Sequence, residues 1–117
     1  MKARMRKFHS GATRDIEDGK LDYEAFLSPL VLERYARYMH QHRTLKDGST
    51  RSGDDWQRGI PLHVYIKSAF RHFMDWWKAH RNGGGDVEEA LCAVIFNAMG
   101  YLHEVLKARR DAANDRG

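Results

Sequence analysis

The chain has 117 residues and a single cysteine, so it is long enough for one domain with a modest core, while a disulfide framework and a multi-cysteine zinc site are excluded. No apolar stretch reaches the roughly 18 residues of a membrane span, and no apolar segment follows the basic N-terminus, so we expect a soluble, cytoplasmic protein. The net charge of +4 lies at the two ends of the chain, because residues 8–106 carry 12 positive and 14 negative side chains; a nucleic-acid-binding surface is therefore not predicted.

The first part of the chain reads as an arm. Its segment at 10–20, SGATRDIEDGK, is rich in turn formers and lacks helical periodicity. We therefore predict an N-terminal arm over residues 1–20, a single helical domain over 21–113, and a disordered tail over 114–117.

The helical domain is expected to begin with a short helix at 21–27. Ser28 and Pro29 then have the residue types of an N-cap and a first helical position, and they predict the start of a long helix that ends near Arg43. The apolar stripe of this helix comprises Leu32, Tyr35, Ala36 and Met39.

A long polar loop follows at 44–59, with three glycines and two serines. A loop of this length in a small domain is either disordered or functional. Its glycine and serine amides, with nearby Lys46, Arg51 and Arg58, offer a possible phosphate nest, although no nucleotide-binding glycine motif is present. The indole of Trp56 has two interpretations, docking on the core or stacking on a base.

The central helix is predicted over 60–81 and has two contrasting faces. One is an apolar stripe that we expect to form the core, comprising Leu62, Ile66, Ala69, Phe70, Phe73 and Trp77. The other face is polar and carries groups suited to binding a phosphorylated ligand, namely Lys67, Ser68, Arg71, His72 and Asp75.

Three glycines at 83–85 end the central helix, and Asp86 with Glu89 resembles a capping box for a last helix that runs to about residue 112. Its predicted core stripe comprises Val87, Leu91, Val94, Ala98, Tyr101 or Leu102, and Val105. On a second face, Asn97 is expected to be partly buried with its amide hydrogen-bonded. Small residues at 93 and 100 leave room beside it, either for a closely packed helix or for a ligand.

No strand signal competes with these helices, so the predicted fold class is all-α, a small bundle of three to four helices with a long central loop. The aromatic residues of the central helix exceed what one neighbouring helix can bury. This excess predicts self-association, most simply a dimer through the central or last helix.

Catalysis of phosphoanhydride hydrolysis requires a metal clamp and a base for water. Asp75 and Glu89 are the candidate metal ligands, for Mg²⁺ or Mn²⁺, but the paired ExxE and ExxD motifs of helical pyrophosphohydrolases are absent. His72 is either a catalytic base or a structural, hydrogen-bonded histidine. Cys92 lies in an apolar helix segment that should raise its pKa, which argues against a nucleophile.

Several segments, in this order, resemble the small phage proteins related to the N-terminal domain of phage dATP/dGTP diphosphohydrolases. The family's recurring elements are a GAxR start, a GK segment, a D/N-W-x-x-G loop, an R-H pair within a helix and an N-A pair in the last helix. The matching residues here are Gly11, Ala12, Arg14, Gly19, Lys20, Trp56, Gly59, Arg71, His72, Asn97 and Ala98.

The resemblance implies a phage protein of the host cytoplasm that handles purine deoxynucleotides. As a metal-dependent hydrolase of dATP or dGTP, it would use His72 and Asp75 in catalysis and Asp75 with Glu89 for Mg²⁺ or Mn²⁺. Ligand contacts would come from Arg14, Lys20, Trp56, Lys67, Arg71 and Asn97. The full-length enzymes carry a further MazG-like domain that this chain lacks. Two alternatives therefore stay open: a non-catalytic oligomeric protein that sequesters nucleotides in counter-defence, and a helical protein–protein adaptor.

Overall fold

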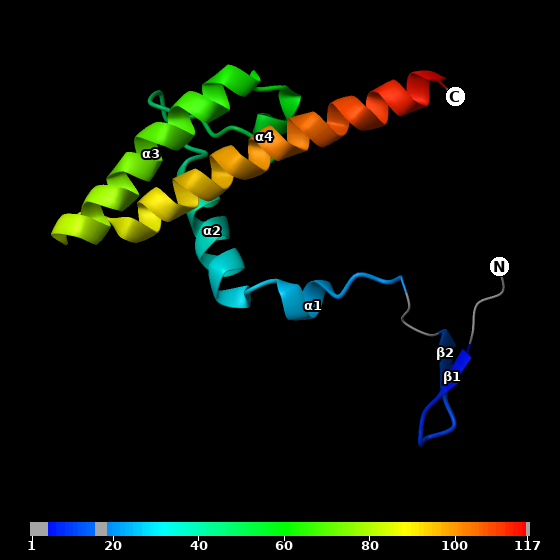
Figure 1. The fold of residues 1–117 in the computed structure, drawn as a ribbon. Helices are drawn as coiled ribbons and strands as arrows, with labels where there is room; N and C mark the ends of the chain where they lie inside the picture. The colour runs from blue at the N-terminus through cyan, green and yellow to red at the C-terminus, as the bar shows by residue number, and fades with distance from the viewer. Residues whose placement is uncertain (1–4, 16–18, 117) are drawn as a thin grey trace.

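The structure is a computed structural model, and it describes residues 5–15 and 19–116. The predicted arm at 1–4 and 16–18, and the last residue of the predicted tail, lie outside the described residues. In chain order the elements are β1 (Met5–Lys7), β2 (Thr13–Asp15), α1 (Tyr23–Phe26), α2 (Pro29–Gln41), the 3-10 helix η1 (Asp55–Arg58), α3 (Leu62–Asn82) and α4 (Val87–Arg116) (Figure 1). The mostly helical architecture is confirmed.

A small antiparallel hairpin corrects the strictly all-α prediction. Strands β1 and β2 pair with Met5 opposite Asp15, and their connection is closed by a hydrogen bond from Phe8 N to Ala12 O at 2.9 Å. Gly11 adopts a positive φ of 90°, as hairpin connections require. Sequence patterning missed this hairpin because strands of three residues are too short to show alternation.

Helix α2 begins as predicted, since the Ser28 hydroxyl accepts a hydrogen bond from Val31 N at 3.3 Å and Pro29 occupies the first turn. The long loop after α2 has defined local structure. An isolated bridge joins Thr44 to Thr50, and η1 ends at Gly59, whose φ is 113°.

Helices α3 and α4 form an antiparallel hairpin that makes the most extensive contact between elements (Figure 1). The three glycines at 83–85 connect them, all with positive φ. Asp86 caps α4 by accepting a hydrogen bond from Glu89 N at 3.0 Å, but the Glu89 carboxylate contacts Arg34 and His42, so half of the predicted capping box forms. Helix α4 extends to Arg116, which makes residues 114–116 of the predicted tail helical.

The faces that α3 and α4 turn toward each other differ from the predicted ones. On α3 the buried side chain is Tyr65, whereas every large apolar residue of the predicted core stripe is exposed. On α4 the fully buried positions are Ala90, Cys92, Ala93, Asn97 and Gly100. The small residues of α4 allow close approach of α3, so the bulky apolar stripe of α3 points away from it. Periodicity identifies an apolar face but not the element that covers it.

Helix α2 packs on α4 through a small cluster of Tyr38, Cys92 and Ala93, with Tyr35, Met39 and Phe96 around it.

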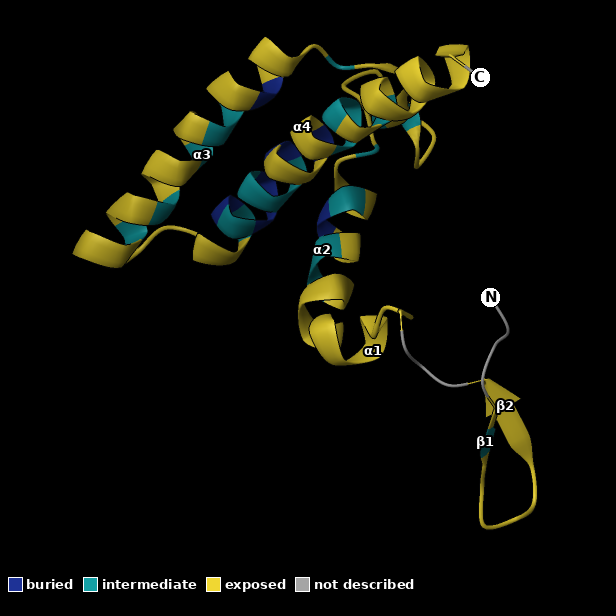
Figure 2. Ribbon diagram, turned by 45° about the vertical axis from the view of Figure 1, so that its right-hand side comes forward, coloured by how far each residue is buried: buried dark blue, intermediate teal, exposed yellow. Residues whose placement is uncertain are grey.

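The described chain is extended. Figures 1 and 2 show that α1 and the β-hairpin lie far from α3 and α4, and most residues in Figure 2 are coloured as exposed. The radius of gyration is 20.0 Å, against about 13 Å for a compact domain of this length. No helix of the described part of the chain has the length and apolar character of a bilayer-crossing segment.

Candidate functional site

The predicted site residues are distributed over three separate cavities. Arg14 and Lys20 line one beside the β-hairpin, Trp56 lines a second, and the third is lined by His72, Asp75 and Glu89. The described residues that line these cavities do not include Lys67, Arg71 or Asn97. His72 and Asp75 therefore share a cavity that Arg71 and Asn97, two of the predicted ligand residues, do not line.

The second cavity, here the α2–loop cavity, combines aromatic and cationic side chains. Its volume is about 460 Å³, and it lies between the C-terminal end of α2, the loop at 51–60 and Phe96 of α4. Its aromatic walls are Tyr38, Trp56 and Phe96. Its basic side chains are His40, His42, Arg43 and Arg51, against one acid, Asp55, among the described lining residues. This cavity is suited to an anionic ligand with an apolar or aromatic part.

Backbone and side-chain hydrogen bonds hold the loop against the end of α2. Arg43 Nε donates to the carbonyl oxygen of Arg51 at 2.9 Å, and Arg51 N donates to the carbonyl oxygen of Arg43 at 2.9 Å. Because Arg43 uses Nε for this bond, its terminal guanidinium nitrogens are left to face the cavity or solvent. The loop therefore places Arg51 among the residues that line the cavity beside the end of α2.

Trp56 docks on α4, which is the first of its two interpretations. Its ring meets His103 of α4 edge-on, with 4.8 Å between ring centroids, and the residue is half-buried. It also lines the α2–loop cavity. A docked indole whose remaining surface borders a cavity is a fixed platform on which a planar group can stack.

His42 and Tyr38 also line the α2–loop cavity and are held in place by contacts with neighbouring groups. The His42 ring lies against the Tyr38 ring with centroids 4.2 Å apart, and His42 Nε2 lies 2.8 Å from Glu89 Oε1. Burial, followed by the negative charge of Glu89, raises the pKa of the Tyr38 hydroxyl. The phenol therefore stays protonated and available as a hydrogen-bond donor.

The third cavity, here the turn cavity, has a volume of about 430 Å³ and lies between the end of α3, the three glycines and the start of α4. His72 Nδ1 lies 3.7 Å from Asp75 Oδ2, which is an ion-pair distance rather than a hydrogen bond. Both Glu89 oxygens already have partners, since Oε2 is 3.4 Å from Arg34 Nη2 and Oε1 is 2.8 Å from His42 Nε2.

The predicted metal site at Asp75 and Glu89 does not fit Mg²⁺ or Mn²⁺. Such ions need several oxygen ligands, and the Glu89 carboxylate is paired with Arg34 and His42. Within the described residues, no group of three or more His, Cys, Asp or Glu side chains is arranged to hold a metal.

The other predicted ligand residues have different surroundings. Asn97 is buried, and its Nδ2 donates to the carbonyl oxygen of Ala93 at 2.8 Å, so its amide serves its own helix, and the ring of Tyr65 fills the space beside Gly100. This arrangement confirms close helix packing at these small residues. Lys67 and Arg71 are exposed on α3.

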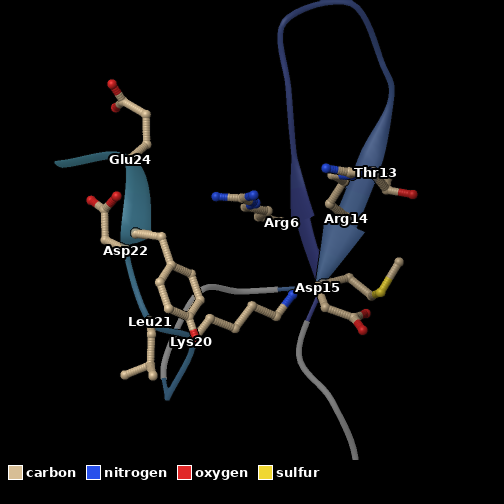
Figure 3. Close-up of a pocket in the computed structure, with 10 residues that line it drawn as sticks. Arg6, Thr13, Arg14, Asp15, Lys20, Leu21, Asp22 and Glu24 are labelled. Atoms are coloured by element: carbon tan, nitrogen blue, oxygen red, sulfur yellow. The ribbon is translucent and has the colours of Figure 1, made fainter. Parts of the chain in front are cut away.

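Arg14 and Lys20 line an open cavity of about 930 Å³ between the β-hairpin and residues 20–24. Figure 3 shows the Lys20 side chain extending toward Asp15 at the end of the hairpin. The acids Asp15, Asp22 and Glu24 share this cavity, so its charge is mixed and it offers no concentrated site for an anion.

The structure adds cavity residues that sequence reasoning missed, namely Tyr38, His42, Arg43 and Phe96. The sequence feature that could have indicated this site is HQHR, the basic end of the helix directly before the glycine-rich loop, because basic side chains and loop amides lie close together there.

Comparison with known proteins adds nothing further: no family model matches the chain, and no curated protein or solved structure matches it. The resemblance to the phage enzymes stays a prediction.

Proposed function

We propose that this protein binds a purine nucleotide in the α2–loop cavity and holds it without hydrolysing it. The observation that carries the proposal is the presence of Trp56 and Tyr38 in the same cavity as Arg43 and Arg51. Stacking of a base on an aromatic side chain contributes roughly 1–3 kcal/mol, and guanidinium groups are well matched to phosphate oxygens. The cavity volume also falls within the range of about 300–1,000 Å³ that is usual for small-molecule sites.

The resemblance to phage dATP/dGTP diphosphohydrolases suggests which nucleotides to test first. Purine deoxynucleoside triphosphates offer the largest stacking surface and the highest phosphate charge among the common deoxynucleotides. A phage protein of the host cytoplasm that retains such nucleotides, or a signalling nucleotide of host defence, would act by sequestration.

Retention without turnover is favoured by the separation of the chemical groups. His72 and Asp75, the predicted catalytic pair, line the turn cavity rather than the α2–loop cavity. Glu89 is paired with Arg34 and His42, so it supports the wall of the α2–loop cavity instead of a metal clamp. Hydrolysis of dATP or dGTP remains the alternative, and product analysis separates the two.

The test is calorimetric titration of the purified protein with dATP and dGTP, with and without Mg²⁺, followed by chromatography of the recovered nucleotide. We expect binding with intact nucleotide recovered. Arg51→Ala should weaken binding by about 10-fold or more, because a charge-assisted hydrogen bond is worth roughly 1.5–3 kcal/mol.

Lys46→Ala is the matched control, since it removes the same charge from the same loop at a residue that does not line the cavity. It should change the dissociation constant less than about twofold. Equal losses in both variants would mean that general charge attracts the ligand. Release of pyrophosphate and monophosphate, abolished by His72→Ala, would instead support the hydrolase.

A further inference from the structure

We infer that a second copy of this chain covers one face of the α3–α4 hairpin, so that two hairpins form a dimeric four-helix bundle. This face, here the outer face, contains the α3 stripe of Leu62, Ile66, Phe70, Phe73 and Trp77. The inference is independent of nucleotide binding, because it concerns a different surface.

The α3 stripe has the spacing and exposure of an interface that lacks its partner. Its members are separated by four, four, three and four residues, which is the spacing of a helix that packs along another helix. All five are exposed, including Phe70 at 65% and Trp77 at 51%. Soluble proteins rarely leave a row of large apolar side chains along one helix in contact with water.

Helix α4 continues the same surface. The inward-facing positions are Tyr65 and His72 on α3 and Ala93 and Asn97 on α4. At 100° per residue, the α3 stripe lies about a third of a turn from its inward positions. On α4, a rotation of about the same size and in the same direction, starting from Ala93 and Asn97, reaches Leu91, Ala98 and Leu102. These three residues are partly or fully exposed.

In a pair of antiparallel helices, residues that are rotated by the same angle and in the same direction from the two contact faces lie on the same side of the pair. The apolar stripes of α3 and α4 therefore form one continuous surface. Helix α2 packs against α4 through Cys92 and Phe96, which lie on the opposite side of α4. The outer face is therefore open along both helices, and nothing within the described chain covers it.

The chain exposes more surface than a compact monomer of its mass. The chain exposes 10048 Å², whereas a compact monomer of 13.6 kDa exposes about 6,600 Å². Obligate dimers bury roughly 1,000–2,500 Å² on each subunit. Part of the excess of roughly 3,400 Å² by the same scaling belongs to the β-hairpin and α1, and part lies on the outer face, where the five α3 residues are 39–65% exposed.

The outer face is also self-complementary. It presents aromatic residues on α3, namely Phe70, Phe73 and Trp77, and aliphatic residues on α4, namely Leu91, Ala98 and Leu102. A two-fold axis that places α3 of one copy over α4 of the other sets aromatic side chains against aliphatic ones. The five residues of the α3 stripe and Leu91, Ala98 and Leu102 of α4 are all uncharged, so contact among these residues brings no like charges together.

The test is sedimentation equilibrium of the full chain, in which wild-type protein should have twice the 13.6 kDa chain mass. Phe70→Lys should shift the mass to one chain, because it places a charge in the middle of the outer face. Leu30→Lys is the matched control: Leu30 is even more exposed, at 83%, but lies in α2 away from the outer face, so the double mass should persist.

Any wild-type mass other than two chains overturns the inference, and so does a dimer that Phe70→Lys leaves intact or that Leu30→Lys dissociates. If Phe70→Lys loses its helical circular dichroism, the melting temperature of the wild-type protein tests the dimer instead. The melting temperature of a dimer must rise with protein concentration between about 1 and 100 µM. A constant melting temperature would overturn the inference.

Discussion

The ring of Tyr65 occupies the space in which a side chain at position 100 would stand. A Cβ added to Gly100 would lie 2.3 Å from Tyr65 Cε1 and 2.6 Å from the hydroxyl oxygen. Tyr65 is only 1% exposed, so its ring has no free space into which to move. Gly100 thus sets how closely α3 and α4 approach, despite the low intrinsic helix propensity of glycine.

We predict that Gly100→Ala lowers the free energy of unfolding by about 1 kcal/mol, since overpacking typically costs roughly 1–3 kcal/mol and the gain in helix propensity offsets about 1 kcal/mol of it. Gly53→Ala is the control, because nothing lies within 4 Å of a Cβ at that position and its φ is not positive. Urea denaturation measures both. If Gly100→Ala costs as much in a Tyr65→Ala background, the contact with the ring is not the cause.

The low reactivity of Cys92 could be predicted from its neighbours in the sequence alone. Its thiol is buried, and burial raises its pKa, which agrees with the expectation that it is not a nucleophile. The prediction for Asn97 is a partly buried, hydrogen-bonded amide; the amide is hydrogen-bonded, and the residue is fully buried. Its partner, the carbonyl oxygen of Ala93, could not be chosen from the sequence over a ligand, because either satisfies the amide.

At the scale of elements, Asp86 caps the start of α4, the helix that packs against both α3 and α2. The Asp86 carboxylate accepts the Glu89 N–H bond and also places negative charge at the positive end of the helix dipole.

We expect Asp86→Ala to lower the free energy of unfolding by about 1 kcal/mol, which is the typical value of an N-cap. Asp86→Asn keeps the hydrogen-bond acceptor and should retain most of the stability. The midpoint of urea denaturation reports both changes. An unchanged midpoint for Asp86→Ala would show that the cap contributes nothing.

Helix ends could be predicted well because their signals are local. Ser28 with Pro29, and Asp86 after three glycines, act within a few residues of their own positions. Helix faces could not be predicted in the same way. The stripe from Leu62 to Trp77 was recognised as apolar, but which helix, or which chain, covers it depends on residues distant in sequence such as Gly100.

The candidate site was harder to predict than the helices for the same reason. The α2–loop cavity requires the loop to fold back on α2 through Arg43 and Arg51, and no periodicity encodes that contact. Sequence reasoning identified Trp56 and the basic, glycine-rich loop. It placed the anion-binding groups on α3 instead, where Lys67 and Arg71 face solvent.

At the scale of the whole molecule, the small core contains several weak acids that are neutral at ordinary pH. Burial, followed by the nearby Tyr38 and Cys92, raises the pKa of Tyr35 to about 12. Burial also raises the pKa values of Tyr38, Tyr65 and Cys92. These groups lie between α2, α3 and α4, so their ionisation opposes packing of all three helices.

We predict that stability is lost at alkaline pH. Each of these groups has a higher pKa in the folded than in the unfolded chain, so its contribution is complete below the unfolded value, near 10 for tyrosine, and disappears as pH rises through the folded value. For Tyr35 the window is therefore about pH 10–12. Denaturation with urea from pH 8 to 12 measures the loss, and Tyr35→Phe should reduce its slope. A stability that stays constant to pH 12 contradicts this.

Helix α2 lies on the side of the α3–α4 hairpin opposite the outer face, and this position affects the number of ligands that a dimer can bind. Pairing along the outer face leaves the α2–loop cavities of both copies open to solvent and directed away from each other. Such an assembly presents two separate compartments, one per chain, and filling one does not obstruct the entrance to the other.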